Sequence, residues 1–169
     1  MSFLNSTLRK LLATPADNTT LIARVTLGAV MLPHGLQKTL GWFGGFGFEG
    51  TMNLFTHAMG IPWILAFAAI AAEALGSLAL ITGVLGRLAA LAIAANMAVA
   101  IATVHWHNGF FMNWLGGQHG EGFEYHILAI GLAAAVVLRG SGSLSVDRWL
   151  ATTIPWTAHR VPLEAHVTA

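Results

Sequence analysis

The stretch PWILAFAAIAAEALGSLALIT, residues 62–82, decides the fold class of this chain. It supplies the roughly 20 mostly apolar residues that an α-helix needs to cross a lipid bilayer. Its one charged residue, Glu73, lies near its centre. A carboxylate at that depth is costly unless it is paired, protonated or hydrated, so Glu73 marks a candidate functional site.

The composition of the whole chain also indicates a membrane protein. The 169 residues are 56% hydrophobic and 9% charged, whereas soluble domains carry about 25% charged residues. The formal net charge is +1 and the basic residues are scattered, which excludes the basic patch of a nucleic-acid-binding protein. The absence of cysteine excludes disulfides and thiolate metal sites. We therefore expect a single membrane domain over residues 1–169, in contact with the lipid bilayer and without a nucleic-acid partner.

Four segments are apolar and long enough to span a membrane, at about residues 21–40, 62–82, 87–105 and 123–139. The fourth is the weakest, because it needs Arg139 as an interfacial anchor to reach across. Basic residues gather before the first span, between the second and third, and after the fourth: Arg9, Lys10, Arg24, Arg87, Arg139 and Arg148. Because Lys and Arg are enriched in cytoplasmic loops, both termini are predicted in the cytoplasm. The predicted fold is an all-α, integral membrane four-helix bundle.

Short amphipathic helices are expected to flank the bundle at the membrane surface, at about residues 2–13 and 145–153. In the second, Ser145 is the predicted N-cap and Asp147 complements the helix dipole from the first turn. Trp149 and Trp156 would anchor this segment at the level of the headgroups.

Polar residues of the spans are predicted to meet inside the bundle. At 1.5 Å per residue, Glu73 and Asn96 lie near the midplane, and His34 and His126 lie roughly 5–8 Å toward the outer side. Three more polar residues come near the outer interface: Lys38, His105 and Glu124.

One stripe of the first span carries Arg24, Met31, His34 and Lys38, because these residues recur at helical spacing. The stripe is unfavourable in lipid and should face the bundle. We therefore predict one cavity that opens to the outer side, with Glu73 at its floor.

Each of these residues also has a simpler interpretation. Glu73 could be a structural carboxylate held by Asn96 or Arg24. Lys38 could extend to the headgroups, because long basic side chains near helix ends do so. Asn96 could serve only to join helices.

Histidines gather in and beside the predicted outer loop, where they could be hydrated interfacial residues or could exchange protons near neutral pH. His105 and His107 point to opposite sides of a helix, so they do not predict a joint metal site, and no metal is expected. His34 with His105 or His126 could bracket a haem in the bundle core, although the sequence has no haem-attachment motif.

The segment GWFGGFGFEG, residues 41–50, is rich in aromatic residues and glycine. It is interpreted either as part of an interfacial aromatic belt or as a flap whose rings stack on a flat ligand such as a quinone. The belt is the favoured interpretation.

The order of these motifs resembles the DoxX family of small bacterial four-helix membrane proteins, relatives of the DoxD subunit of thiosulfate:quinone oxidoreductase. The matching motifs are Arg24, His34-Gly35-Leu36-Gln37-Lys38, Gly41, Glu73-x-x-Gly76, Gly83, Arg87, His105, Gly120-Glu121-x-x-Glu124-Tyr125-His126 and Gly140-x-Gly142-x-x-Ser145-x-Asp147. The resemblance implies a multi-pass protein of the bacterial cytoplasmic (inner) membrane. It also implies a link to quinone-coupled oxidation, to resistance against quinones and catechols, or to redox-stress complexes.

The leading hypothesis is a membrane subunit that binds a quinone or related aromatic and supports its reduction or detoxification. The predicted catalytic residues are Glu73, His34, His126 and His105, and the predicted ligand-binding residues are Lys38, Arg24, Asn96, Glu124 and Tyr125. Electrons would come from a redox partner protein or an acquired haem, because the chain has no cysteine cluster and no nucleotide-binding motif.

Two alternatives belong to other functional classes. One is a non-enzymatic scaffold that anchors soluble redox enzymes at the membrane. The other is a small transporter of aromatic compounds, a role that usually requires a homo-oligomer.

Overall fold

A computed structural model describes residues 2–154, and every regular element within them is a helix. The α-helices are α1 (Ser2–Leu12), α2 (Asn18–Leu40), α3 (Gly47–Asn53), α4 (Trp63–Thr82), α5 (Gly86–Ala100), α6 (Glu124–Arg139) and α7 (Val146–Thr153). Short 3-10 helices, η1 (Trp42–Gly44) and η4 (Trp106–Asn108), and π-helices, η2 (Leu54–Ala58) and η3 (Ile101–His105), connect them. Residues 2–154 contain no strand, which confirms the predicted all-α class.

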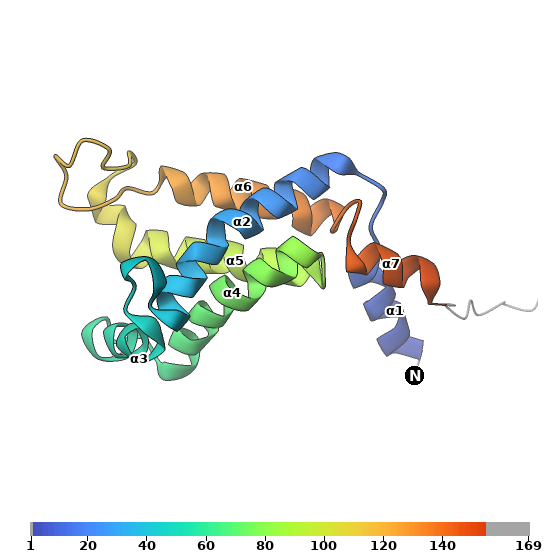
Figure 1. Ribbon diagram of the computed structural model, residues 1–169, viewed down its shortest axis with the longest axis horizontal. Helices are drawn as coiled ribbons and strands as arrows, with labels where there is room; N and C mark the ends of the chain where they lie inside the picture. The colour runs from blue at the N-terminus through green and yellow to red at the C-terminus, as the bar shows by residue number, and fades with distance from the viewer. Residues whose placement is uncertain (1, 155–169) are drawn as a thin grey trace, which may run out of the picture.

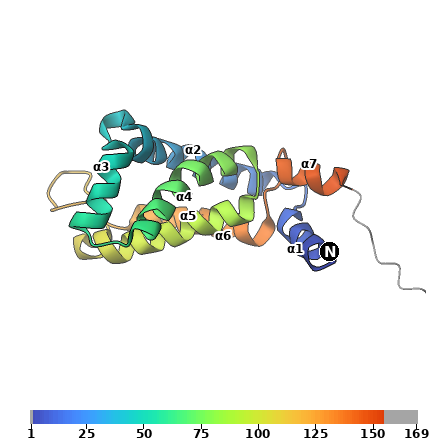
Figure 2. The ribbon, with the colours of Figure 1, turned by 90° about the horizontal axis from the view of Figure 1, so that it is seen from below.

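The long helices α2, α4, α5 and α6 lie side by side (Figures 1 and 2). Helix α2 packs on α4 and α6, and α5 packs on the same two helices, so each has two neighbours. Helices α1 and α7 lie together at one end of this group, and α3 lies at the other (Figures 1 and 2).

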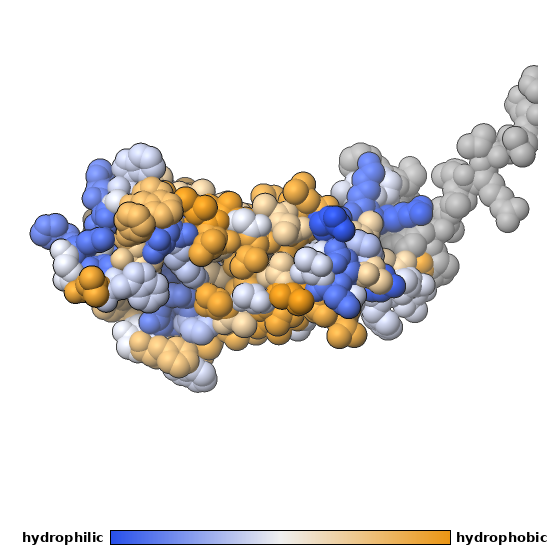
Figure 3. All heavy atoms as spheres, turned by 90° about the horizontal axis from the view of Figure 1, so that it is seen from above, coloured by the Kyte–Doolittle hydropathy of each residue, from blue (hydrophilic) through white to orange (hydrophobic). Residues whose placement is uncertain are grey.

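Two helices of the described residues are both long and apolar enough to cross a membrane. They are α4 and the continuous helix Gly86–Asn108, which α5 forms with η3 and η4. Helix α2 has sufficient length but carries a polar stripe, and α6 has only 16 residues. Seen from above, apolar side chains cover the middle of the molecule and polar side chains gather at both ends (Figure 3).

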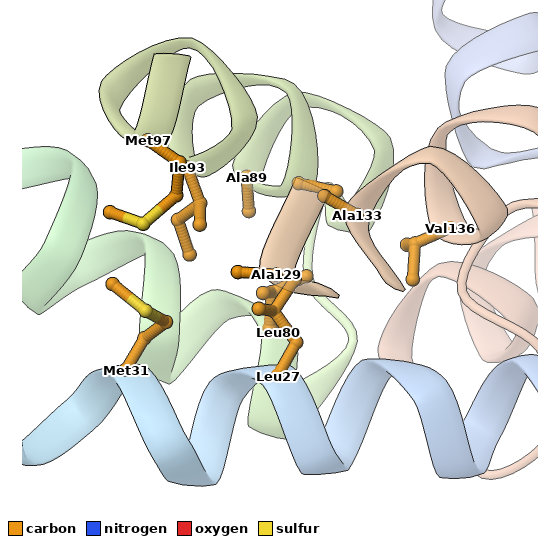
Figure 4. Packing of buried hydrophobic residues seen from close by; sticks show 10 residues of the cluster. Leu27, Met31, Leu80, Ala89, Ile93, Met97, Ala129, Ala133 and Val136 are labelled. Carbon is orange, nitrogen blue, oxygen red and sulfur yellow. The ribbon is translucent and has the colours of Figure 1, made fainter. Parts of the chain in front are cut away.

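A layer of apolar side chains fills the centre between the long helices (Figure 4). Leu27 of α2, Leu80 of α4 and Ile93 of α5 are almost completely buried there. Alanines such as Ala133 of α6 complete the layer, because small side chains allow close approach of helix backbones.

Helices α2 and α4 approach so closely that glycine is required at their contact. A Cβ atom on Gly35 would lie 2.6 Å from the Cα atom of Ala74. On Gly28 it would lie 2.9 Å from the carbonyl oxygen of Ser77. These two glycines therefore set the distance between α2 and α4.

Arg24 holds together the end of the bundle near α1 and α7. Its guanidinium is fully buried and donates hydrogen bonds to the carbonyl oxygens of Leu80, Ile81 (2.7 Å), Ser141 (2.9 Å) and Leu144 (3.1 Å). The first two belong to the last turn of α4, whose carbonyl groups have no partner within the helix. Arg24 therefore joins α2 to the end of α4 and to the turn before α7.

Asp147 acts at the same end: it lies in the first turn of α7, as predicted, and it also has a second role. Ser145 does cap α7, as expected. The carboxylate of Asp147, however, accepts hydrogen bonds from the backbone N–H groups of Leu85 (2.7 Å) and Gly86 (2.9 Å). Asp147 therefore caps the start of α5. It can do so because the turn before α7 brings the start of α7 against the connection between α4 and α5.

The two predicted flanking segments are helical, as α1 and α7, and they contact each other. Arg9 and Lys10 of α1 are exposed, as is Trp149 of α7. Trp156 lies outside the described residues.

Arg24→Met is expected to lower the free energy of unfolding by on the order of 3 kcal/mol, because several buried carbonyl groups lose their charged donor. Thermal unfolding in mild detergent measures this loss. Arg139→Met is the matched control, since its side chain is 66% exposed and pairs only with Asp17. The control should lose less than about 1 kcal/mol. Equal losses in the two variants would contradict the role given to Arg24.

Candidate functional site

A cavity of about 840 Å³ lies between α2, α4, α5 and α6, on the α3 side of the central apolar layer. Most of its wall is apolar. Its polar lining residues are His34, Lys38, Glu73, Asn96, Thr103, His105, Glu121, Tyr125 and His126. The structure thus brings together all the sequence-predicted site residues except Arg24 and Glu124.

An ion pair forms one wall of the cavity. The Nζ atom of Lys38 lies 2.5 Å from Oε2 of Glu73, and Nδ2 of Asn96 donates to Oε1 of Glu73 at 2.8 Å. The three residues come from α2, α4 and α5. Glu73 is therefore held by Asn96, as one prediction had it, and by Lys38 rather than Arg24.

The close contact of α2 and α4 brings this pair together. Gly35 packs directly on the backbone at Ala74, so Lys38, about one turn later on α2, reaches the neighbouring Glu73. Lys38 thus points to the interior of the bundle and not to the headgroups.

The two charges are not equally enclosed. The Glu73 side chain is 6% exposed, and that of Lys38 is 24% exposed. An ammonium group has three donors and a carboxylate has further lone pairs. Among the described residues, Lys38 donates one hydrogen bond, to Glu73, so the other N–H donors of its ammonium group can bind a ligand in the cavity. The pair is therefore both a structural contact and a polar anchor.

A row of rings extends from this anchor along the cavity wall. Ring centroids are 6.0 Å apart for His34 and Tyr125, 5.5 Å for Tyr125 and His126, and 4.1 Å for His126 and His105. The Nδ1 atom of His105 lies 2.8 Å from the carbonyl oxygen of Glu121. Since a carbonyl only accepts, Nδ1 carries the proton, and Nε2 of the neutral ring is an acceptor.

His126 holds a polar atom that the protein does not satisfy. Its Nδ1 is buried and has no hydrogen-bond partner among the described residues. A buried polar atom of this kind requires an explanation, such as a bound water or ligand. Because His126 lines the cavity, the site has unused hydrogen-bonding capacity at the His105–His126 end as well as at Lys38.

The histidines as placed do not fit a haem. His105 and His126 are in ring contact, and Tyr125 contacts both His34 and His126. A haem between His34 and either of the other two would have to displace these rings. Within residues 2–154, no group of three or more His, Cys, Asp or Glu residues is arranged to hold a metal ion.

Glu124 is not among the residues that line the cavity, in contrast to its predicted binding role. Its Oε1 accepts a hydrogen bond from the backbone N–H of Met112 at 3.0 Å. Oε2 of Glu121 likewise accepts from Asn113, at 2.6 Å. Both carboxylates thus hold the segment between η4 and α6 over the end of the cavity, which Met112 and Glu121 help to line.

Arg24 is also absent from the cavity, although it lies on the predicted stripe of α2. The stripe is long: ten residues separate Arg24 from His34, about 15 Å along a helix. The helical period predicts the face of α2 on which Arg24 lies, but it does not predict how far the cavity extends along that face. Arg24 faces the bundle at the opposite end from the cavity.

The aromatic segment 41–50 does not form a flap of stacked rings over the ligand space. Trp42, Phe43 and Phe46 are 55%, 67% and 74% exposed, and none lines the cavity. Phe55 and Ile61 line it instead. These two residues were not predicted. The sequence pattern identifies them only weakly as cavity residues, because they are apolar residues in the connection between two predicted spans.

Comparison with known proteins gives one match. A family model described as DoxX matches residues 19–106, just over half of the chain. No curated protein and no solved structure matches. The matched region includes Lys38, Glu73 and Asn96 but ends before α6.

Lys38→Met and Glu73→Gln are expected to be destabilising singly, because each leaves a buried group without its charged partner. The double variant should lose less than the sum, with a coupling energy of about 1–3 kcal/mol. Denaturation in mild detergent, run as a double-mutant cycle, measures the coupling.

The matched control pair is Asp17 and Arg139, whose charges lie 3.2 Å apart at the surface. A hydrogen bond from the Thr20 hydroxyl and another from the Thr19 backbone lower the pKa of Asp17, so this pair is ionised at neutral pH. Its coupling should stay below about 1 kcal/mol. Additive losses at Lys38 and Glu73 would contradict a coupled buried pair.

Proposed function

The chain belongs to the DoxX family, whose members are membrane-associated, and on this premise we propose that its cavity binds a quinone or a related aromatic and supports the reduction or detoxification of that ligand. The observation that carries the proposal is the Lys38–Glu73 ion pair in the wall of a mostly apolar cavity. A fold or family alone does not define a reaction, so the argument depends on this site.

We further propose that α2, α4, α5 and α6 all cross the bacterial inner membrane as a four-helix bundle with both termini in the cytoplasm. Support comes from the grouping of basic residues at the α1–α7 end, including Arg9, Arg87 and Arg148. Helices α2 and α6 complete the packing around α4 and α5, although they are less apolar or shorter. The cavity then lies on the outer side.

The chemistry of a quinone matches the polar groups of the cavity. Its two oxygens accept hydrogen bonds and its ring is flat and apolar. Lys38 has N–H donors beyond the one given to Glu73, and His34 lies close to it on the same helix face. The apolar wall would enclose the ring, as in most small-molecule sites.

Reduction of a quinone to a hydroquinone consumes two electrons and two protons. His105 and His126 can exchange protons at one end of the cavity, and the Lys38–Glu73 pair can do so at the other. The electrons would come from a redox partner protein, since the sequence has no cysteine and no nucleotide-binding motif.

The scaffold and transporter hypotheses predict different experimental outcomes from those of the quinone-binding proposal. A scaffold would retain its partner protein when Lys38 and Glu73 are replaced. A transporter, acting as a homo-oligomer, would move aromatic compounds across proteoliposome membranes without reducing them. Either result, obtained without specific quinone binding, would support that hypothesis and contradict the quinone-binding proposal.

Lys38→Met is expected to lower the affinity for a short-chain benzoquinone at least about tenfold, because the ligand oxygen loses a charged donor. Titration calorimetry in mild detergent measures the affinity. Mass spectrometry of organic extracts should also find quinone in the wild-type protein and less in the variant. Arg139→Met is the control and should bind like the wild type, since Arg139 lies at the opposite end of α6 from the cavity residue His126 and does not line the cavity. Unchanged affinity in Lys38→Met would contradict the proposal.

A further inference from the structure

The cavity is open along one side, between α4 and α5. Its lining residues from α2 and α6, such as Met31 and His126, are buried or half-buried. Lining residues of α4 and α5, in contrast, include exposed ones. Five of these, which we call the α4–α5 mouth, are Leu65, Ala68, Ala92, Ala95 and Val99.

The α4–α5 mouth is apolar and belongs to the membrane-facing surface. Its residues lie on α4 and on helix Gly86–Asn108, the two described helices that are long and apolar enough to cross a membrane. Most residues in the apolar window of each helix are not buried within the protein. In a bilayer, an opening bounded by such side chains faces hydrocarbon and not water.

The end of the cavity toward α7 is closed, and the end toward α3 is partly covered. Toward α3, the segment between η4 and α6 is held in place by Glu121 and Glu124 and by the bond from the Glu124 N–H to the Phe110 carbonyl at 2.9 Å. Toward α7, the apolar layer that contains Leu80 and Ile93 fills the bundle. Exposed lining residues also occur toward α3, such as Met59, Gly60 and Glu121, so the α4–α5 mouth is the exposed part of the lining that α4 and α5 form.

The volume of the cavity also indicates how large a ligand it can hold. At about 840 Å³ it is near the upper end of the 300–1,000 Å³ that accommodates drug-sized ligands. A single quinone ring fills only part of this space. The remainder, between the ion pair and the α4–α5 mouth, has an almost entirely apolar wall formed by residues such as Ala69 and Ala72.

These observations rest on the proposed function and make it more specific. We infer that the ligand is a membrane-dissolved aromatic with a long apolar tail, which enters sideways from the bilayer through the α4–α5 mouth. The polar ring binds at Lys38 and Glu73, and the tail remains in the mouth. A water-soluble aromatic of the same ring chemistry lacks the group that fills this part of the site.

The inference is tested with two probes in protein-containing nanodiscs: a benzoquinone with a long isoprenoid tail, and the same ring with a methyl group in place of the tail. Concentrations are expressed as mole fractions in the lipid, which removes the effect of partitioning. The wild type should bind the tailed probe at least about tenfold more tightly. Ala68→Trp and Ala95→Trp, which fill the mouth, should reduce this ratio toward one.

Leu75→Trp and Leu91→Trp are the matched controls, because these residues are exposed on the same two helices but do not line the cavity. They should keep the wild-type ratio. Binding of the tailless probe by Ala68→Trp and Ala95→Trp shows that these variants are folded.

The outcomes separate the two proposals. If the wild type binds neither probe, the proposed function fails. If it binds both with equal affinity, or if the mouth variants keep the wild-type ratio, the sideways entry of a tailed ligand is wrong while the quinone site stands.

Discussion

Glu73 can occupy the interior of an apolar helix because both of its carboxylate oxygens meet a donor. Lys38 contributes a charge at 2.5 Å and Asn96 an amide at 2.8 Å. The two donors belong to different helices, so α2 and α5 must both approach α4. Gly35 permits one of these approaches, because any side chain there would collide with the backbone at Ala74. The packing of the half of the molecule nearer α3 is thus constrained by the need to pair one buried charge.

The buried charged groups at the two ends of the bundle have different surroundings. At the α1–α7 end, Arg24 and Asp147 bind backbone groups of several elements, although the buried Nε of Arg87 has no partner among the described residues. At the other end, Lys38 lines a cavity and has N–H donors beyond the one that it gives to Glu73. Nδ1 of His126 also has no partner among the described residues. Saturated polar groups stabilise a fold, whereas unsatisfied groups around a cavity are the places where a ligand can bind. The presence of a cavity beside Lys38 and His126 supports the proposal that this end binds a ligand, whereas Arg24 and Asp147 stabilise the other end.

Much of this arrangement could be predicted from periodicity and depth alone. Hydropathy predicted the helices, and the rise per residue placed Glu73 beside Asn96. The roles of Arg24 and Glu124 and the second role of Asp147 were not predicted, because each binds backbone groups of another segment of the chain. Backbone donors and acceptors are present at every position, so no side-chain pattern in the sequence identifies them.

An infrared difference spectrum between protein with and without a saturating short-chain benzoquinone tests the central claim most directly. The carboxylate stretching band of Glu73 is first assigned by comparing ligand-free wild type with Glu73→Gln. The account predicts that this band shifts when the ligand binds, because Lys38 then shares its hydrogen bonds between Glu73 and the ligand oxygen. A Glu73 band that stays unchanged while the protein is saturated would show that the ion pair is only structural and that the ligand binds elsewhere.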